Sequence, residues 1–199
     1  MAKVEIKSVA GSVLYTADID DSIPSGLQLR AALERAVSER INRVGASLDG
    51  ASLDGASLVG ASLDRALLDG ASLVGASLDR ALLDGASLVG ASLFDASLDR
   101  ASLDGAKLAD DLTLVGERPI FMVGPIGSRA DTMVGHITNR GLRISTGCFR
   151  LGTIDEFTAA VAQEHGTNAF AREYLRALEL LELHAELYPA PVESETKAV

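Results

Sequence analysis

Four residues of this 199-residue chain have side chains that commonly carry chemistry: three histidines and one cysteine. His136, His165 and His184 lack metal-ligand spacing to one another, to the cysteine or to an acidic cluster. Cys148 could act as a nucleophile if His136 lay across a hairpin from it and took its proton. A small buried thiol and structural histidines are the simpler interpretation. The sequence therefore predicts no catalytic residue, no metal site and no cofactor.

The segment Gly124–Arg129, GPIGSR, has the glycines of a phosphate-binding loop. It lacks the GxxxxGK pattern and no helix is expected directly behind it. Its proline also removes one of the backbone donors that such a loop needs. We therefore expect a turn here, and in the absence of a Ser-His-Asp order or a carboxylate pair we expect a protein that is not an enzyme.

The composition and charge of the chain argue against a nucleic-acid-binding protein and against a membrane protein. The net charge is -10, and residues 46–110 alone carry ten acidic and four basic side chains, a net -6. Such a chain is a poor candidate for direct binding to nucleic acid, which needs a surplus of Lys and Arg. A single cysteine, the absence of an 18-residue apolar run and the absence of a signal-peptide core predict a soluble cytoplasmic protein with no membrane segment.

Residues 46–110 consist of thirteen consecutive pentapeptides, each with Ala first and Leu third. In a helix, a step of five residues rotates each Leu by about 500°, so the leucines would form no face. In an extended chain, Ala and Leu point to one side and the glycines that recur at the fifth position allow a corner. The pattern predicts a β-helix, in which each pentapeptide is one side and one turn. A fifteen-residue unit at Ala56–Gly70 recurs at Ala71–Gly85, so three or four sides per coil both remain open at this point.

This run resembles the pentapeptide-repeat family, whose pattern is Ala, then a small polar residue, then Leu. The resemblance implies a right-handed, four-sided β-helix of about three coils, with twenty residues per coil and with Ala and Leu inside. Ser replaces the family's commoner Asp or Asn at the second position. Since fifteen does not divide into twenty, the fifteen-residue unit would record how the sequence was copied rather than one turn of the structure.

The flanks predict two further elements around the β-helix. Alternating residues at 3–7 and 13–16 indicate a hairpin, and an apolar stripe indicates a helix at 27–41, so the N-terminal element has the order ββα. We expect these boundaries: residues 1–45 for the N-terminal ββα cap, 46–115 for the β-helix, 116–189 for a C-terminal α+β domain and 190–199 for a polar tail. The fold class is thus mainly β, with caps because open β-helix ends expose unpaired backbone.

The C-terminal domain is expected to contain three strands followed by two helices. The strands are predicted at 119–123, 132–138 and 142–145. A capping box at Thr153–Glu156 opens a helix that ends at His165-Gly166, and a second helix runs from Ala169 to Leu187. Gly147-Cys148-Phe149 and Gly152–Phe157 are similar to segments that flank pentapeptide repeats in small phage-type proteins of unknown role, a resemblance that implies no activity.

With twenty residues per coil, side chains twenty apart stack into columns about 4.8 Å apart. This spacing predicts an acidic column, a shorter acidic column beside Arg80 and Arg100, and an apolar strip. The residues are Asp64, Asp84 and Asp104 in the first, Asp79 and Asp99 in the second, and Val74 and Phe94 in the strip. A solvated face explains the acids most simply, and the alternative is a DNA mimic that binds or protects a type II topoisomerase.

The length of the repeat region favours the simpler interpretation, because about 16 Å of rod would cover only about five base pairs. The sequence accordingly predicts a non-catalytic structural or protein-interaction scaffold, with a protein partner or a second copy of itself. An apolar stripe on the last helix is the predicted homodimer contact. Its residues are Phe170, Tyr174, Leu178 and Leu181.

Overall fold

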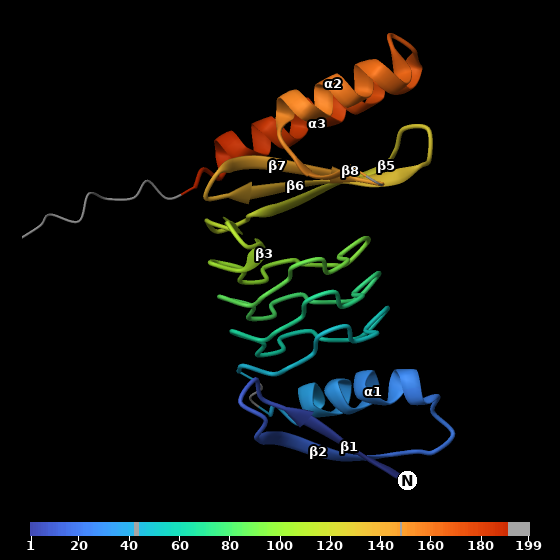
Figure 1. Cartoon of the computed structure of the whole chain (residues 1–199), viewed down its shortest axis with the longest axis vertical. Helices are drawn as coiled ribbons and strands as arrows, with labels where there is room; N and C mark the ends of the chain where they lie inside the picture. The colour runs from blue at the N-terminus through green and yellow to red at the C-terminus, as the bar shows by residue number, and fades with distance from the viewer. Residues whose placement is uncertain (42–43, 148, 191–199) are drawn as a thin grey trace, which may run out of the picture. The chain divides into compact units, whose positions relative to one another are not determined.

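A computed structural model describes residues 1–41, 44–147 and 149–190 (Figure 1). The described chain is mainly β with three helices and divides into two compact units, Met1–Thr113 and Leu114–Val199. Cys148 and most of the predicted polar tail lie outside the described residues. Within these described ranges, no helix is long and apolar enough to cross a membrane.

The first unit begins with the predicted order of two strands and a helix. Strand β1, Ala2–Lys7, pairs antiparallel with β2, Val13–Ile19, and helix α1 spans Ser25–Ser38. Ala17, Ile19 and Ala32 form a small core between the hairpin and the helix. The unit ends in two short antiparallel strands, β3 at Lys107–Ala109 and β4 at Leu112–Thr113.

Between these elements, the repeat region is a β-helix whose coils are joined by parallel bridges. Ser52 bridges to Ser72 and Ser72 bridges to Ser92, and the same interval of twenty residues recurs through the repeats. From Leu48 to Leu88, the third residue of the pentapeptide adds a backbone bond of the kind seen from Leu48 N–H to Leu67 O, 2.7 Å long. One coil therefore contains four pentapeptides, and the fifteen-residue copied unit is not a coil.

The interior of the β-helix is filled by the Ala and Leu of the repeats. Most of these side chains, such as Ala66 and Leu68, are completely buried, as their spacing predicts. Leu93 and Leu98 in the last coil are only half-buried. Each side chain in the middle coils packs against a coil above and a coil below, so the packing is uniform there. The packing is looser around Leu93 and Leu98.

The fifth position adopts the left-handed backbone conformation in every pentapeptide but the last, which ends at Asp110. Gly50 and Gly55 have φ values of 64° and 63°, and Arg65 and Arg80 adopt nearly the same conformation with φ values of 58° and 59°. A residue with a Cβ pays about 1 kcal/mol to do so. This cost explains why most of the repeats carry Gly at the corner.

Helix α1 lies across the first coil and bonds to its backbone (Figure 1). Arg30 Nη1 donates to Asp54 O at 2.6 Å, and Ser57 N–H donates to Glu34 Oε1 at 2.9 Å. In the inner coils, the backbone oxygen that corresponds to Asp54 O and the N–H that corresponds to that of Ser57 both bond to the preceding coil. The first coil has no preceding coil to supply these partners. The ion pair of Arg30 and Glu34, 3.1 Å apart, thus replaces backbone partners at the N-terminal end of the β-helix.

The second unit is a four-stranded antiparallel sheet with two helices on one face (Figure 1). The strands occur in sheet order as β5, Ile120–Ile126; β6, Asp131–Thr138; β7, Gly141–Thr146; and β8, Phe149–Gly152. Three of them match the predicted strands, whereas β8 is too short to give a sequence signal. Met133 and Ile144 pack from the sheet against Phe157 and Leu181 of the helices.

The helices of this unit begin where the sequence predicts. Helix α2, Ile154–His165, has the capping box, with Glu156 N–H donating to Thr153 Oγ1 at 3.2 Å and Thr153 N–H donating to Glu156 Oε2 at 2.8 Å. These bonds to Thr153 hold the pKa of the Glu156 carboxyl below its usual value. Helix α3, Ala169–Leu187, begins after Asn168, whose side chain accepts from Ala171 N–H.

Candidate functional site

The predicted acidic columns take part in the hydrogen bonding of the β-helix. Asp104 N–H donates to Asp84 Oδ1 at 3.1 Å, and Asp84 N–H donates in turn to Asp64 Oδ1 at 3.2 Å. In the second column, Asp99 N–H donates to Asp79 Oδ1 at 3.0 Å. Asp64, Asp79 and Asp84 thus each accept a backbone N–H from the next coil.

This arrangement follows from the backbone pattern of the repeat. The inner-coil N–H groups at the first, second, third and fifth positions donate to backbone oxygens. Where an Asp lies twenty residues earlier, as for Asp69 and Val74, the N–H at the fourth position donates to that carboxylate. Hydroxyls add a second bond, as from Ser102 Oγ to Asp84 Oδ1 at 2.6 Å and from Ser97 Oγ to Asp79 Oδ1. At an exposed surface such bonds contribute about 1 kcal/mol, which outweighs the few tenths lost to stacking like charges.

The predicted apolar strip of Val74 and Phe94 belongs to a column that begins with Asp54. Val74 N–H donates to Asp54 Oδ1 at 3.2 Å, and Gly75 N–H donates to Phe94 O at 2.9 Å, so the two strip residues do occupy successive coils. Val74 is exposed and Phe94 is half-buried. The apolar part of this column is therefore two residues long.

The predicted dimer stripe on α3 mostly faces the interior of the protein. Tyr174, Leu178 and Leu181 belong to the core between the helices and the sheet, and only Phe170 of the four is exposed. An apolar stripe of this kind also forms wherever a helix packs on its own sheet, and the oligomer contact stays a prediction. The exposed leucines of α3 are Leu175, Leu180, Leu183 and Leu187.

His136 is buried on β6, and neither ring nitrogen has a hydrogen-bond partner among the described residues. Burial lowers the pKa of this imidazole to about 4, so the ring is neutral near pH 7. Strand pairing places His136 opposite Arg143, while the turn toward β8 follows Thr146, the partner of Met133. The proposed partner Cys148 lies outside the described residues.

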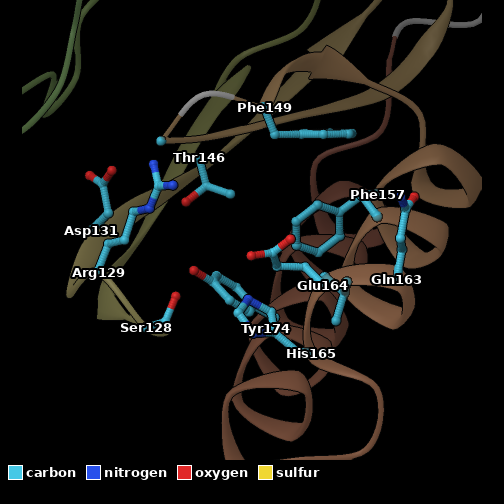
Figure 2. A pocket seen from close by; sticks show the side chains of 13 residues that line it. Ser128, Arg129, Asp131, Thr146, Phe149, Phe157, Gln163, Glu164, His165 and Tyr174 are labelled. Atoms are coloured by element: carbon cyan, nitrogen blue, oxygen red, sulfur yellow. The ribbon is translucent and has the colours of Figure 1, made fainter.

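The second unit contains a cavity of about 400 Å³, which we name the hairpin–helix cavity. One side is the turn between β5 and β6, which carries Ser128 and Arg129, and the other is the end of α2 with Glu164 and His165 (Figure 2). Its further lining residues are Asp131, Thr146, Gly147, Phe149, Phe157, Ala160, Val161, Gln163 and Tyr174.

Aromatic rings in mutual contact form the apolar wall of the cavity. Phe157 contacts Phe149 edge to face at 5.4 Å and Tyr174 at 6.0 Å between ring centroids. The His165 ring stacks on Tyr174 at 5.5 Å with an interplanar angle of 25°. The residues come from β8, α2 and α3, so the wall exists only when all three elements are packed together.

A glycine permits the close approach of Tyr174 to the hairpin turn. A Cβ on Gly127, which has a φ of 71°, would lie 2.1 Å from the Tyr174 phenol oxygen. The Gly127 N–H also donates to Glu173 Oε2 at 2.9 Å, which joins this turn to α3. The predicted turn is therefore confirmed for Gly127–Arg129, whereas Gly124–Ile126 belong to strand β5. Gly127 makes room for an aromatic wall rather than for a phosphate.

Charged groups lie at two separate places around the cavity. The Glu164 carboxylate points into the space between hairpin and helices, and Gln163 points away from it (Figure 2). On the hairpin side, a Cβ at Gly147 would lie 3.4 Å from Asp131 Oδ2 and 3.9 Å from Arg129 Nη1, so both charges approach the same position. Within the described ranges, no group of three or more His, Cys, Asp or Glu side chains could hold a metal ion.

Sequence reasoning missed this cavity as a site. Tyr174 was assigned to an oligomer contact and His165 to the end of a helix, and neither pattern indicates that the two rings stack. The lining residues come from three separate stretches, 128–131, 146–149 and 157–174. The one available signal was the pair of glycines at 127 and 147 beside polar residues, which predicts turns but no shared site.

Comparisons with known proteins concern the repeats. The family model for pentapeptide repeats matches residues 46–85 and 71–110, together about a third of the chain. Searching the curated proteins yields no match.

Solved structures similar to this chain are pentapeptide-repeat proteins. The protein Rfr23 of the cyanobacterium Cyanothece 51142 is 36% identical over 32% of this chain and 44% of its own, with a TM-score of 0.31. HetL of Nostoc sp. strain PCC 7120, a protein involved in heterocyst differentiation regulation, is 34% identical over 31% of this chain and 36% of its own, with a TM-score of 0.17. A thylakoid-lumen protein of Arabidopsis thaliana is 28% identical over 35% of this chain and 55% of its own, with a TM-score of 0.18. In each case the match spans less than two thirds of the other protein.

Proposed function

Because residues 46–110 are pentapeptide repeats, we propose that this chain is a non-catalytic scaffold that binds another protein through the side faces of its β-helix. In this proposal the coils are right-handed and four-sided, with one pentapeptide to a side. The interval of twenty residues between bridged positions supports four pentapeptides per coil. The proposal places the protein in the cytoplasm, with neither nucleic acid nor membrane as a direct partner.

One observation carries the proposal: the surface carboxylates of the β-helix are held in place before any partner arrives. Asp64, Asp79 and Asp84 each accept a backbone N–H from the next coil. Side chains that are already fixed lose less conformational entropy on binding than free ones. We therefore assign the two acidic columns, with Val74 and Phe94 on a neighbouring face, to the contact with a protein that presents basic and apolar groups.

The test removes the charge of one column and keeps its hydrogen bonds. Replacing Asp64, Asp84 and Asp104 by Asn leaves an Oδ1 acceptor at each position, so the β-helix should fold with an unchanged circular dichroism spectrum. In affinity capture from a native extract with quantitative mass spectrometry, we expect this variant to lose at least one protein that the wild type retains. Asp49 and Asp69 form a matched control, because they accept in the same way on another face. Capture that is lost equally in both variants would argue against a contact specific to one face.

The same variants test the alternative of a DNA mimic directed at a type II topoisomerase. Inhibition of gyrase supercoiling that disappears in the triple Asn variant would support mimicry. No effect at about micromolar protein would count against it, because a Kd in that range corresponds to only about 8 kcal/mol. The rod of about 16 Å is short for this role.

Self-association is a further form of the scaffold proposal. Leu180, Leu183 and Leu187 are among the exposed apolar side chains of α3 that are available to a second copy, since the predicted stripe is mostly buried. Light scattering of the wild type against a variant with Leu180 and Leu183 changed to Glu separates the cases. A lower mass in the variant would assign this surface to a dimer, and an equal mass would remove it.

A further inference from the structure

We propose that the hairpin–helix cavity binds a small organic cation, an amine or quaternary ammonium with an aromatic or aliphatic group attached. This inference concerns the second unit alone and does not depend on the scaffold function proposed for the repeats. It rests on the size of the cavity, on the rings that line it and on the placement of its charges.

The size and lining of the cavity are those of a small-molecule site. Its volume of about 400 Å³ falls within the range of about 300–1,000 Å³ found for ligand pockets. Phe149, Phe157 and Tyr174 supply an aromatic wall, to which His165 adds a fourth ring. A pocket with an apolar wall and few inward polar groups suits a ligand with one charged end.

Aromatic walls discriminate between ligands by charge. The face of an aromatic ring carries negative potential, so it attracts an ammonium group and repels a carboxylate. Phe157 and Tyr174 are both held by the core, with 2% and 7% of their surface exposed, so they cannot turn away to accommodate the wrong charge. The wall thus favours a cation over an anion of the same shape.

The carboxylates around the cavity outnumber its permanent cation. Glu164 points inward from the end of α2, and among the described residues it has no hydrogen bond or ion pair (Figure 2). Arg129 lies on the opposite side, and the Asp131 carboxylate is the acidic group near it, since both approach Gly147. Asp131 is itself fixed by the Thr132 N–H, which donates to its Oδ1 at 2.8 Å. Glu164 is therefore the group that receives the cationic nitrogen.

Three probes that share one ring test the charge preference: benzylammonium, benzyl alcohol and benzoate. Binding to the full chain is followed by ¹H–¹⁵N NMR up to about 10 mM probe, which detects millimolar affinities of about 4 kcal/mol. We expect benzylammonium to bind about tenfold more tightly than benzyl alcohol, which corresponds to about 1.4 kcal/mol, and to shift the amides of Glu164 and His165. Stronger binding of benzoate would assign the cavity to an anion held by Arg129 and overturn the proposal. Equal binding of all three probes, or none, would also overturn it.

Variants then test the assigned residues. Glu164→Gln should abolish the preference for benzylammonium over benzyl alcohol, because it removes the charge from an exposed side chain without disturbing the core. Glu186→Gln is the matched control, since Glu186 is an exposed glutamate of α3 outside the cavity lining. Phe149→Leu keeps an apolar side chain and should weaken benzylammonium severalfold while affecting benzyl alcohol less. A preference that survives Glu164→Gln would overturn the assignment of that carboxylate.

Discussion

The β-helix and the C-terminal unit differ in how their contacts are distributed along the sequence. In the repeats, backbone donors meet their acceptors at fixed intervals, and the pattern of one coil recurs in the next. In the C-terminal unit, contacts join distant positions without a period: Gly127 bonds to Glu173 across 46 residues, and His184 bonds to Arg118 across 66. The structure of the periodic region can therefore be predicted from its sequence. In the region without a period, the sequence predicts the helices and strands but not which residues meet at the cavity.

The largest expected effect tests whether the regular interior is uniform. Leu78→Ala removes a completely buried side chain between two coils and should lower the free energy of unfolding by about 4 kcal/mol. Leu98→Ala, in the same column but half-buried, should cost about 1 kcal/mol. Urea unfolding followed by circular dichroism measures both. Equal losses would mean that the last coil is packed as tightly as the middle one.

The second prediction is that the stability of the two units depends differently on pH. The first unit contains no histidine, whereas the second buries His136 with a folded pKa of about 4 against an ordinary value of 6.5. The unfolded chain binds a proton first as pH falls, so stability should decline from about pH 6.5 to about pH 4, by up to about 3 kcal/mol. Unfolding of the wild type and of His136→Phe across this range measures the difference. The same pH dependence in both proteins would contradict it.

The third prediction concerns the turn that supports the cavity wall. Gly127→Ala strains a left-handed backbone and places a methyl group against Tyr174, so it should destabilise the second unit by about 2 kcal/mol. Gly141→Ala is a matched control with a φ of 82° and open space around it, and should cost about 1 kcal/mol. Thermal unfolding compares them. If the two variants lost equal stability, the tyrosine contact would contribute nothing.

The smallest effect tests the role of the aspartate columns. Asp84→Ala removes the acceptor for Asp104 N–H and Ser102 Oγ and should cost about 1 kcal/mol, because these bonds lie at an exposed surface. Asp84→Asn keeps the Oδ1 acceptor and should cost less than about 0.5 kcal/mol. The two urea midpoints provide the comparison. An Asn variant as unstable as the Ala variant would show that the charge, not the acceptor, stabilises the column.

The sequence predicted the flanking elements well because their signals are local. The capping box at Thr153–Glu156 and the helix Ala169–Leu187 depend on neighbouring residues and agree with the structure. Strand β8 has four residues, too few for a period, and was not predicted as a strand. Tyr174 packs in the core of its own unit, which the sequence did not predict, because an apolar helix face does not specify whether a sheet or another chain covers it.

By itself, the sequence determined the β-helix: a five-residue period with Ala and Leu on one side is compatible with no other regular structure, so packing follows from pattern. It also placed Asp64, Asp84 and Asp104 in one column once the coil length was known. Only the tertiary structure decided what those carboxylates do, because the donors to Asp64 and Asp84 lie a full coil away. The cavity was likewise decided by folding alone, since Arg129, Phe149 and Glu164 meet only when hairpin and helices pack, and no local signal encodes that meeting.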